Sequence, residues 1–198
     1  MNLKFIILGS MIMSFSCVAE NFNISINGDI GECSNVTSET VVKECFGIQN
    51  ITSGEDYNRW GDKYPTTTLF PNDEGKKLVI YWNEGAKEGF SSINITSPQS
   101  KWIVAGKLHI GQDLSELLRL NKEPLAISHY DNDDQGLILW KKGKLANTIA
   151  NASVYLTPKG ELTDAQWSGI SGQSFVWSGE VDKLGVELEV TEIMLHGM

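Results

Sequence analysis

The sequence predicts an α+β fold, a degenerate tandem αβ repeat with a mainly antiparallel sheet and short helices packed on one face. The chain of 198 residues is 41% hydrophobic and 21% charged, which is typical of a globular protein. Two segments, 37–98 and 102–157, share one order of elements: a capped helix, a polar loop and an apolar run. Each run ends in tryptophan, Trp82 or Trp140, before a polar turn. We expect one domain over 20–198, with chance similarity of short elements as the alternative to a repeat.

The first unit begins with local signals for a strand and a helix. Residues 22–31 alternate apolar and polar as far as Ile26, which predicts a strand before a turn. Thr37 or Ser38 can cap a helix that runs through Cys45 and ends at glycine.

The next segment is expected to be irregular and then to become β-rich. Residues 48–75 are rich in Gly, Asp, Thr and Pro, so we expect a loop there. Residues 77–82 form a β-rich run typical of a central strand, and 90–95 are expected to form another.

The second unit contains the clearest helix signal. Asp113 and Glu116 are three residues apart, as in a capping box, and Pro124 ends the segment. The expected buried face carries Leu114, Leu117 and Leu118.

Strands are predicted again toward the C-terminus. Residues 137–140 and 153–157 are apolar runs, and a Gly/Ser-rich stretch covers 168–179. A final strand is expected over 185–195, where the alternation of apolar residues changes phase. This change of phase predicts a β-bulge.

The N-terminal 19 residues are typical of a secretory signal peptide. Lys4 precedes a short apolar stretch, and Cys17 and Ala19 provide small residues before a cleavage site at Glu20. The stretch is too short and broken for a transmembrane anchor. We expect a periplasmic or secreted protein, with a lipid-anchored envelope protein held through Cys17 as the alternative.

Cysteine usage fits an oxidising compartment. Without Cys17, the chain keeps Cys33 and Cys45, which we expect to form a disulfide. Closing this loop of about 13 residues stabilises the fold by roughly 3 kcal/mol. Two free thiols and a metal pair are the alternatives. Five Asn-x-Ser/Thr sequons would be modified only in a glycosylating host: Asn23, Asn35, Asn50, Asn94 and Asn151.

The spacing of residues between positions 106 and 145 resembles that of a known group. The positions concerned are Gly106, Leu108, Ile110, Gly111, Leu114, Glu116, Leu117, Leu120, Asn121 and Pro124. They match the Gly-Leu-x-Ile-Gly-x-Ser/Asp-Leu-x-Glu-Leu-x-x-Leu-Asn-x-x-Pro helix of an uncharacterised group of bacterial secreted or envelope proteins. Residues 68–73 and 78–82 also look like that group, which brings the coverage to about residues 40–145.

A more distant likeness is to the tandem αβ folds of β-lactamase inhibitor proteins and outer-membrane assembly lipoproteins. The chain departs from the first group in one loop, where Ser128–Gly136 replaces an aromatic, glycine-rich segment. The group has no activity that could be transferred, so the resemblance implies a fold and a location.

No motif indicates an enzyme, a metal or a cofactor. The chain has no Gly-x-Ser-x-Gly elbow, P-loop or Gly-x-Gly-x-x-Gly, and its three histidines lack zinc-site spacing. Residues 131–136 imitate the start of a calcium loop, but Lys142 stands where a bidentate glutamate is needed. We therefore expect no cofactor, no metal and no catalytic residue, with a hydrolase built on distant carboxylates as a minor alternative.

A net charge of −9 argues against nucleic acid or an anionic membrane as the partner. The leading expectation is a non-enzymatic protein-binding module that is inhibitor-like in character. We expect its partner to be a second protein, one that is basic. Its alternative is a structural envelope lipoprotein. The expected partner-binding residues are loop aromatics and an acidic loop: Tyr57, Arg59, Trp60, His129, Tyr130, Asp131, Asp133 and Asp134.

Overall fold

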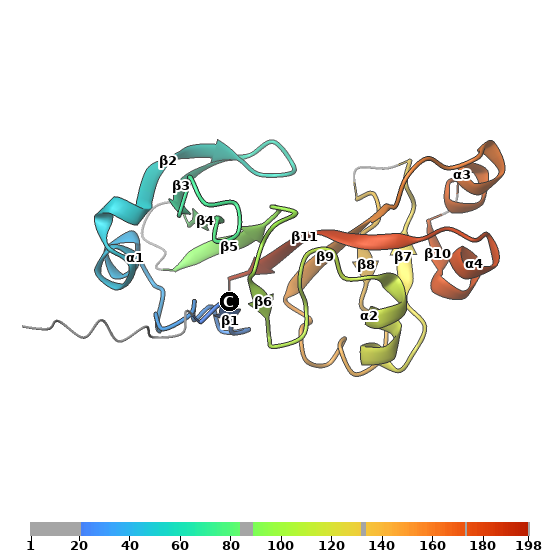
Figure 1. The fold of residues 1–198 in the computed structure, drawn as a ribbon, viewed down its shortest axis with the longest axis horizontal. Coiled ribbons are helices and arrows are strands. Elements are labelled where there is room, and N and C mark those ends of the chain that lie inside the picture. Colours follow the sequence, from blue (N-terminus) through green and yellow to red (C-terminus); the bar gives the residue numbers. More distant parts are fainter. Residues whose placement is uncertain (1–20, 84–88, 132–133, 173, 198) are drawn as a thin grey trace, which may run out of the picture.

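A computed structural model describes residues 21–83, 89–131, 134–172 and 174–197 (Figure 1). The signal peptide expected over 1–19, with Cys17, and the side chain of Asp133 lie outside these residues.

A six-stranded antiparallel sheet forms the centre of the molecule, in the order β2-β3-β4-β5-β11-β9. Its strands are β2 (Ile51–Tyr57), β3 (Lys63–Leu69), β4 (Leu78–Trp82), β5 (Phe90–Ile95), β9 (Ala152–Pro158) and β11 (Leu188–His196). The C-terminal strand β11 lies between β5 and β9, so it joins the early and late parts of the chain (Figure 1). The α+β class with a mainly antiparallel sheet is confirmed, and the tandem repeat stays a prediction.

The remaining elements are short. A three-stranded sheet has the order β10-β7-β8, and β1 pairs in parallel with β6. These strands are β1 (Asn23–Ile24), β6 (Ile103–Val104), β7 (Ala126–Ser128), β8 (Ile138–Leu139) and β10 (Phe175–Trp177). The helices are α1 (Glu39–Phe46), α2 (Leu114–Asn121), α3 (Asp164–Ile170), α4 (Ser178–Lys183) and the 3₁₀ turn η1 (Ile48–Asn50). None of the helices in the described ranges has the length and apolar character that crossing a membrane requires.

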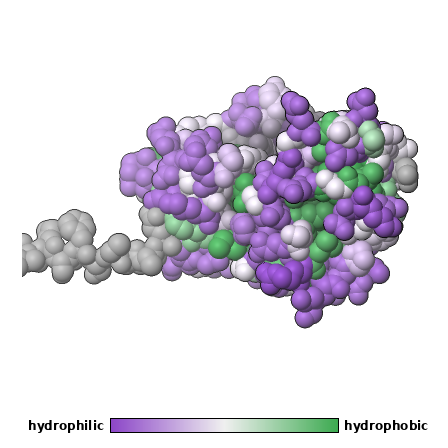
Figure 2. Space-filling view, turned by 45° about the vertical axis from the view of Figure 1, so that its right-hand side comes forward, coloured by the Kyte–Doolittle hydropathy of each residue, from purple (hydrophilic) through white to green (hydrophobic). Residues whose placement is uncertain are grey.

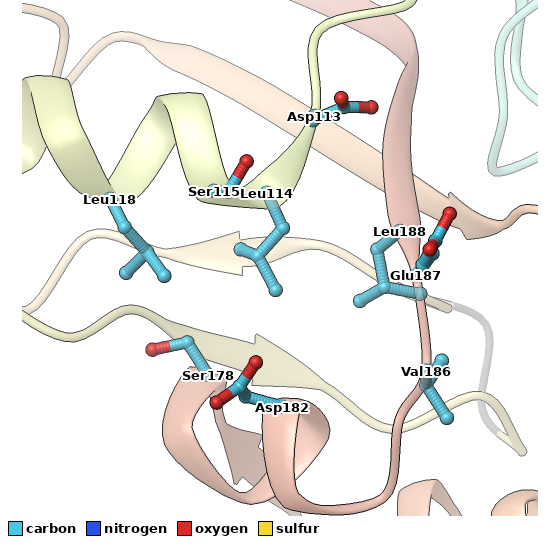
Figure 3. A pocket seen from close by; sticks show the side chains of 9 residues that line it. All are labelled: Asp113, Leu114, Ser115, Leu118, Ser178, Asp182, Val186, Glu187 and Leu188. Atoms are coloured by element: carbon cyan, nitrogen blue, oxygen red, sulfur yellow. The ribbon is translucent and has the colours of Figure 1, made fainter.

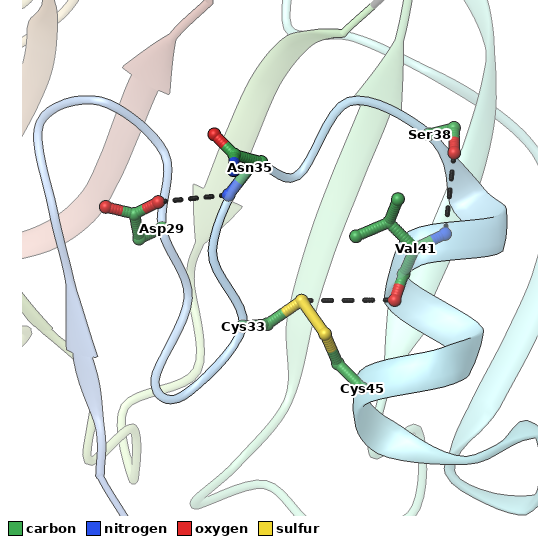
Figure 4. Close-up of a disulfide and its surroundings, with 6 residues drawn as sticks. All are labelled: Asp29, Cys33, Asn35, Ser38, Val41 and Cys45. Atoms are coloured by element: carbon green, nitrogen blue, oxygen red, sulfur yellow. Dashed lines mark hydrogen bonds between the residues drawn. A yellow bond between two sulfur atoms is a disulfide. The ribbon is translucent and has the colours of Figure 1, made fainter.

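Helix α1 forms as its local sequence predicts. The Ser38 hydroxyl accepts a hydrogen bond from the Val41 N–H at 3.4 Å, and Gly47 ends the helix with φ of 79°. Cys33 and Cys45 form the expected disulfide, with their Cα atoms 5.6 Å apart (Figure 4). The bond ties the end of α1 to the N-terminal loop.

Helix α2 has the predicted position but not the predicted cap. Asp113 precedes the helix, yet its carboxylate makes no capping hydrogen bond and pairs with Lys159 at 2.5 Å. The predicted capping box is therefore wrong, because a cation from a distant segment competes for the carboxylate. Leu117 is fully buried, as the leucine spacing predicts.

The expectation of an irregular segment over 48–75 is wrong. Strands β2 and β3, of seven residues each, form a hairpin there, paired from Ile51–Leu69 to Tyr57–Lys63. Strand β2 is an edge strand that is exposed for most of its length, so its sequence shows no alternation of apolar and polar residues. By contrast, the predicted bulge in the last strand is confirmed between Val190 and Glu192.

The two faces of the large sheet differ. Ile80, Ile93 and Leu195 pair across neighbouring strands and belong to the buried core. On the opposite face, one row crosses the sheet through Thr66, Tyr81, Ser92 and His196. A parallel row contains Val79, Asn94, Met194 and Ser153. This second face is therefore polar and aromatic.

Candidate functional site

A groove runs between α2 and α4, and we call it the α2–α4 groove. Its enclosed part, about 290 Å³, lies between Leu114 and Leu118 of α2 and the side chains of Ser178 and Asp182 of α4 (Figure 3). Residues 186–188, at and before the start of β11, close one side.

The groove widens at the C-terminal end of α2. A more open hollow of about 750 Å³ shares Leu118, Ser178 and Asp182 with the enclosed part. Its other walls include Lys122, Pro124, Lys142, Trp177 and Lys183. The shared residues make the two hollows one continuous groove. Figure 2, in which this side of the molecule comes forward, shows apolar side chains among hydrophilic ones.

Local packing fixes the walls of the groove. Helix α2 buries Leu117 completely and leaves Leu118 half-buried at the groove. The backbone N–H of Leu125 donates to the Ser178 hydroxyl at 3.2 Å, which holds α4 against the segment after α2. Val181 of α4 is fully buried, so Asp182 and Lys183 stay exposed.

Asn121 organises the wide end. Its side-chain amide donates to the carbonyls of Glu123 and Lys142 at 2.9 and 3.1 Å, and its oxygen accepts from the Leu145 N–H at 3.0 Å. A Cβ at Gly143 would lie 2.2 Å from the Asn121 amide oxygen, so only glycine fits there. Asn121 is fully buried, and its three bonds hold the two loops that carry Glu123 and Lys142.

The two parts of the groove differ in charge. Asp182 and Glu187 line the narrow part, where Asp113 is already paired with Lys159. Charges of both signs line the wide part, and Lys142 pairs there with Glu123 at 3.3 Å. The charged residues of the wide part are Lys122, Glu123, Lys142, Glu180, Asp182 and Lys183. The apolar floor lies mainly in the narrow part: Leu114, Leu118, Val186 and Leu188. Such a floor binds apolar side chains, and the charges at the rim add selectivity.

The predicted aromatic site lies elsewhere, at the tip of the β2–β3 hairpin. Tyr57 and Trp60 are 62% and 52% exposed, as expected for surface aromatics. Arg59 is exposed as well, but its guanidinium is engaged within the molecule: it binds the Glu192 carboxylate at 2.7 Å and lies 3.9 Å from the centre of the Tyr155 ring. Burial raises the pKa of Glu192, and the Arg59 charge opposes this rise.

A small pocket of about 150 Å³ lies between the hairpin tip and the polar face of the sheet. It is lined by Asn58, Trp60, Asp62, Tyr64, Tyr81, Ser91, Ser92, Met194 and His196. Burial raises the pKa of Tyr81, and the negative charges of Asp56 and Glu192 add to the rise. Burial also lowers the pKa of His196, whose Nε2 lies 2.8 Å from the Ser153 hydroxyl.

The acidic loop differs from its expected form. His129 and Tyr130 are buried, so the expectation that they flank an exposed surface is wrong. The Tyr130 hydroxyl donates to the Leu156 carbonyl at 2.9 Å, because the loop packs against β9. Asp131 is exposed and accepts from the Gly172 N–H at 3.0 Å, while Asp134 is half-buried.

Metal ligands do not gather in the part of the chain that the structure describes. Within it, no group of three or more His, Cys, Asp or Glu side chains is placed to hold a metal ion. Asp131 of the calcium-like sequence is engaged by the backbone of a distant loop.

Sequence reasoning missed the α2–α4 groove. The leucine spacing of α2 marked an apolar face but could not separate buried Leu117 from groove-lining Leu118. The other wall begins at the end of the Gly/Ser-rich stretch 168–179 and continues through Lys183, where no helix was predicted. No family model, curated protein or solved structure matches the chain.

Proposed function

We propose that the protein is a non-enzymatic binding module that holds a segment of another protein in the α2–α4 groove. The observation that carries the proposal is an apolar floor with charged rims, acidic at the narrow part and of both signs at the wide part. Peptides bind such grooves by burying a few apolar side chains, while charges at the rim select orientation and partner. An inhibitor-like action, in which the bound segment belongs to an enzyme, fits this mode.

The occupant is a peptide segment with an apolar centre. Its acidic residues lie near Lys122 and Lys183, and its basic residues lie near Asp182 and Glu187. Burial of two or three apolar side chains on the leucine and valine floor supplies the affinity. The net charge of −9 accelerates encounter with a partner that is basic overall.

We also propose that the protein is exported to the periplasm or secreted, like the bacterial group that its sequence resembles. The Cys33–Cys45 disulfide supports this location, because such bonds persist in oxidising compartments. The mass of the mature N-terminus tests the proposal. A chain that begins at Glu20 is free, a lipidated Cys17 means an anchored protein, and an unprocessed Met1 contradicts export.

The groove is tested by selecting peptides from a displayed random library on the wild-type protein, with counter-selection on Leu118→Glu. Selected peptides should share an apolar centre with both acidic and basic residues beside it. Lys183→Glu should weaken them several-fold at low salt. The matched control is Arg119→Glu, an exposed position on α2 outside the groove lining, which should leave binding unchanged.

Thermal unfolding of each variant separates loss of binding from loss of the fold. Lys183 is exposed, so we expect its substitution to leave the fold intact. Peptides that bind Leu118→Glu as tightly as the wild type would contradict the proposal. Selected peptides without both acidic and basic residues beside the apolar centre would do so too.

A further inference from the structure

The pocket at the hairpin tip has a chemistry different from that of the α2–α4 groove. Three aromatic side chains line it, and they come from separate elements: Trp60 from the β2–β3 turn, Tyr64 from β3 and Tyr81 from β4. The Tyr64 and Tyr81 rings are nearly perpendicular, at 81° with centres 6.3 Å apart. The two tyrosine rings therefore form adjacent walls of the pocket, and Trp60 at the hairpin tip provides a further aromatic wall.

The charge around the pocket is negative. Asp62 lines it, and Asp56 lies close enough to Tyr81 for its charge to act on the hydroxyl. The Glu192 carboxylate also acts on Tyr81, but it is paired with Arg59. Lysine and arginine are missing from its lining residues, all of which the structure describes. His196 stays neutral near neutral pH, because burial lowers its pKa. An anionic ligand is therefore disfavoured, and a cation is favoured.

The same face of the sheet already holds one cation by this chemistry. The Arg59 guanidinium lies over the Tyr155 ring and binds the Glu192 carboxylate. Aromatic faces attract cations through their negative quadrupole, and a neighbouring carboxylate adds a direct charge interaction. The pocket at the hairpin tip combines the same kinds of group, aromatic rings and a carboxylate, and it opens at the surface of the molecule.

Size limits the ligand. The pocket of about 150 Å³ is well below the roughly 300 Å³ at which pockets for drug-sized ligands begin. It accommodates one small head group or the end of one side chain.

We propose that the pocket formed by Trp60, Tyr64, Tyr81 and Asp62 binds an alkylammonium group. The group belongs either to a lysine side chain of a protein or to a small quaternary amine. This site is separate from the α2–α4 groove and does not depend on the function proposed for it.

Pairs of probes that differ only in charge test the proposal by calorimetry or by tryptophan fluorescence. Choline is compared with its neutral isostere 3,3-dimethyl-1-butanol, and Nα-acetyl-lysine methylamide is compared with its Nε-acetylated form. In at least one pair, the cation should bind about tenfold more tightly than its neutral counterpart. The pair that responds identifies the source of the ammonium group.

Trp60→Ala and Asp62→Asn should each weaken that binding, about tenfold for Trp60, and Trp60→Phe should restore most of it. Both positions are exposed at a turn, so the variants should keep the fold. Trp167→Ala, another exposed tryptophan outside the pocket, is the matched control and should have no effect. Neutral probes that bind as well as the cations, or no binding by either cation in the millimolar range, would overturn the proposal.

Discussion

The two halves of the molecule are held together in different ways. Around β2–β5, long strands pair continuously and the disulfide ties α1 to the N-terminal loop. Around α2 and α4, the helices are short, the strands β7, β8 and β10 have two or three residues each, and side chains bond to distant backbone. Examples are Asn121, Ser178 and Tyr130. Strands β9 and β11 extend across both halves (Figure 1).

The difference explains where the grooves lie. Around the continuous sheet the hollows are small, about 150 Å³ under the hairpin and about 240 Å³ beside the N-terminal loop and Phe90. Short elements fixed by a few side-chain hydrogen bonds do not fill the space between them, so a wide groove remains between α2 and α4. A buried apolar core extends through both halves, and a covalent tie plus continuous sheet pairing add to it around β2–β5.

The largest expected effect is a loss of stability in the half of the molecule that contains α2. Leu117→Ala removes a fully buried side chain and should lower the free energy of unfolding by about 2–5 kcal/mol. Leu118→Ala, one residue further along and half-buried at the groove, should cost clearly less. Urea unfolding of the two variants measures the difference. Equal losses would mean that the groove wall is part of the core.

The next largest effect is expected from removing the Cys33–Cys45 disulfide in the other half. Replacing Cys33 and Cys45 together by alanine should destabilise the protein by roughly 3 kcal/mol, because the unfolded chain gains freedom. Hydrogen exchange should rise in α1 and the N-terminal loop before it rises in α2 and α4. Uniform loss of protection would show that the two halves unfold as one unit.

Smaller effects are expected at the N-terminal ends of helices α1 and α2. Ser38→Ala removes a capping hydrogen bond and should cost about 0.5–2 kcal/mol. Asp113→Ala should cost less, since the Asp113 carboxylate makes no capping bond and pairs with exposed Lys159. Thermal unfolding of both variants ranks them. A greater loss in Asp113→Ala would mean that the carboxylate caps α2 in solution.

The smallest effect is a pH dependence that arises from His196 at the end of the inner strand β11. Burial lowers the pKa of His196 below its ordinary 6.5, so the unfolded chain binds this proton more tightly than the folded one. The free energy of unfolding should therefore fall as pH decreases from 6.5 through the folded pKa. His196→Gln should remove this part of the pH profile, and His109→Gln should keep it. An unchanged profile in His196→Gln would contradict the assignment.

Several features were determined by the sequence alone because they depend on neighbours along the chain. Ser38 and Gly47 set the start and the end of α1 through local backbone geometry. The change in the alternation of apolar residues after Val190 marks the bulge in β11. The disulfide follows from there being two cysteines after position 17. The spacing of leucines in α2 likewise placed Leu117 in the core.

Other features were decided only by the tertiary structure, because their partners are distant in sequence. Strand β2 shows no alternation, since it forms an exposed edge and its existence depends on pairing with β3. Asp113 is drawn from the helix cap by Lys159, and Arg59 is drawn inward by Glu192, 133 residues away. The α2–α4 groove arises from helices about 60 residues apart in the chain, whose short lengths leave an apolar floor uncovered.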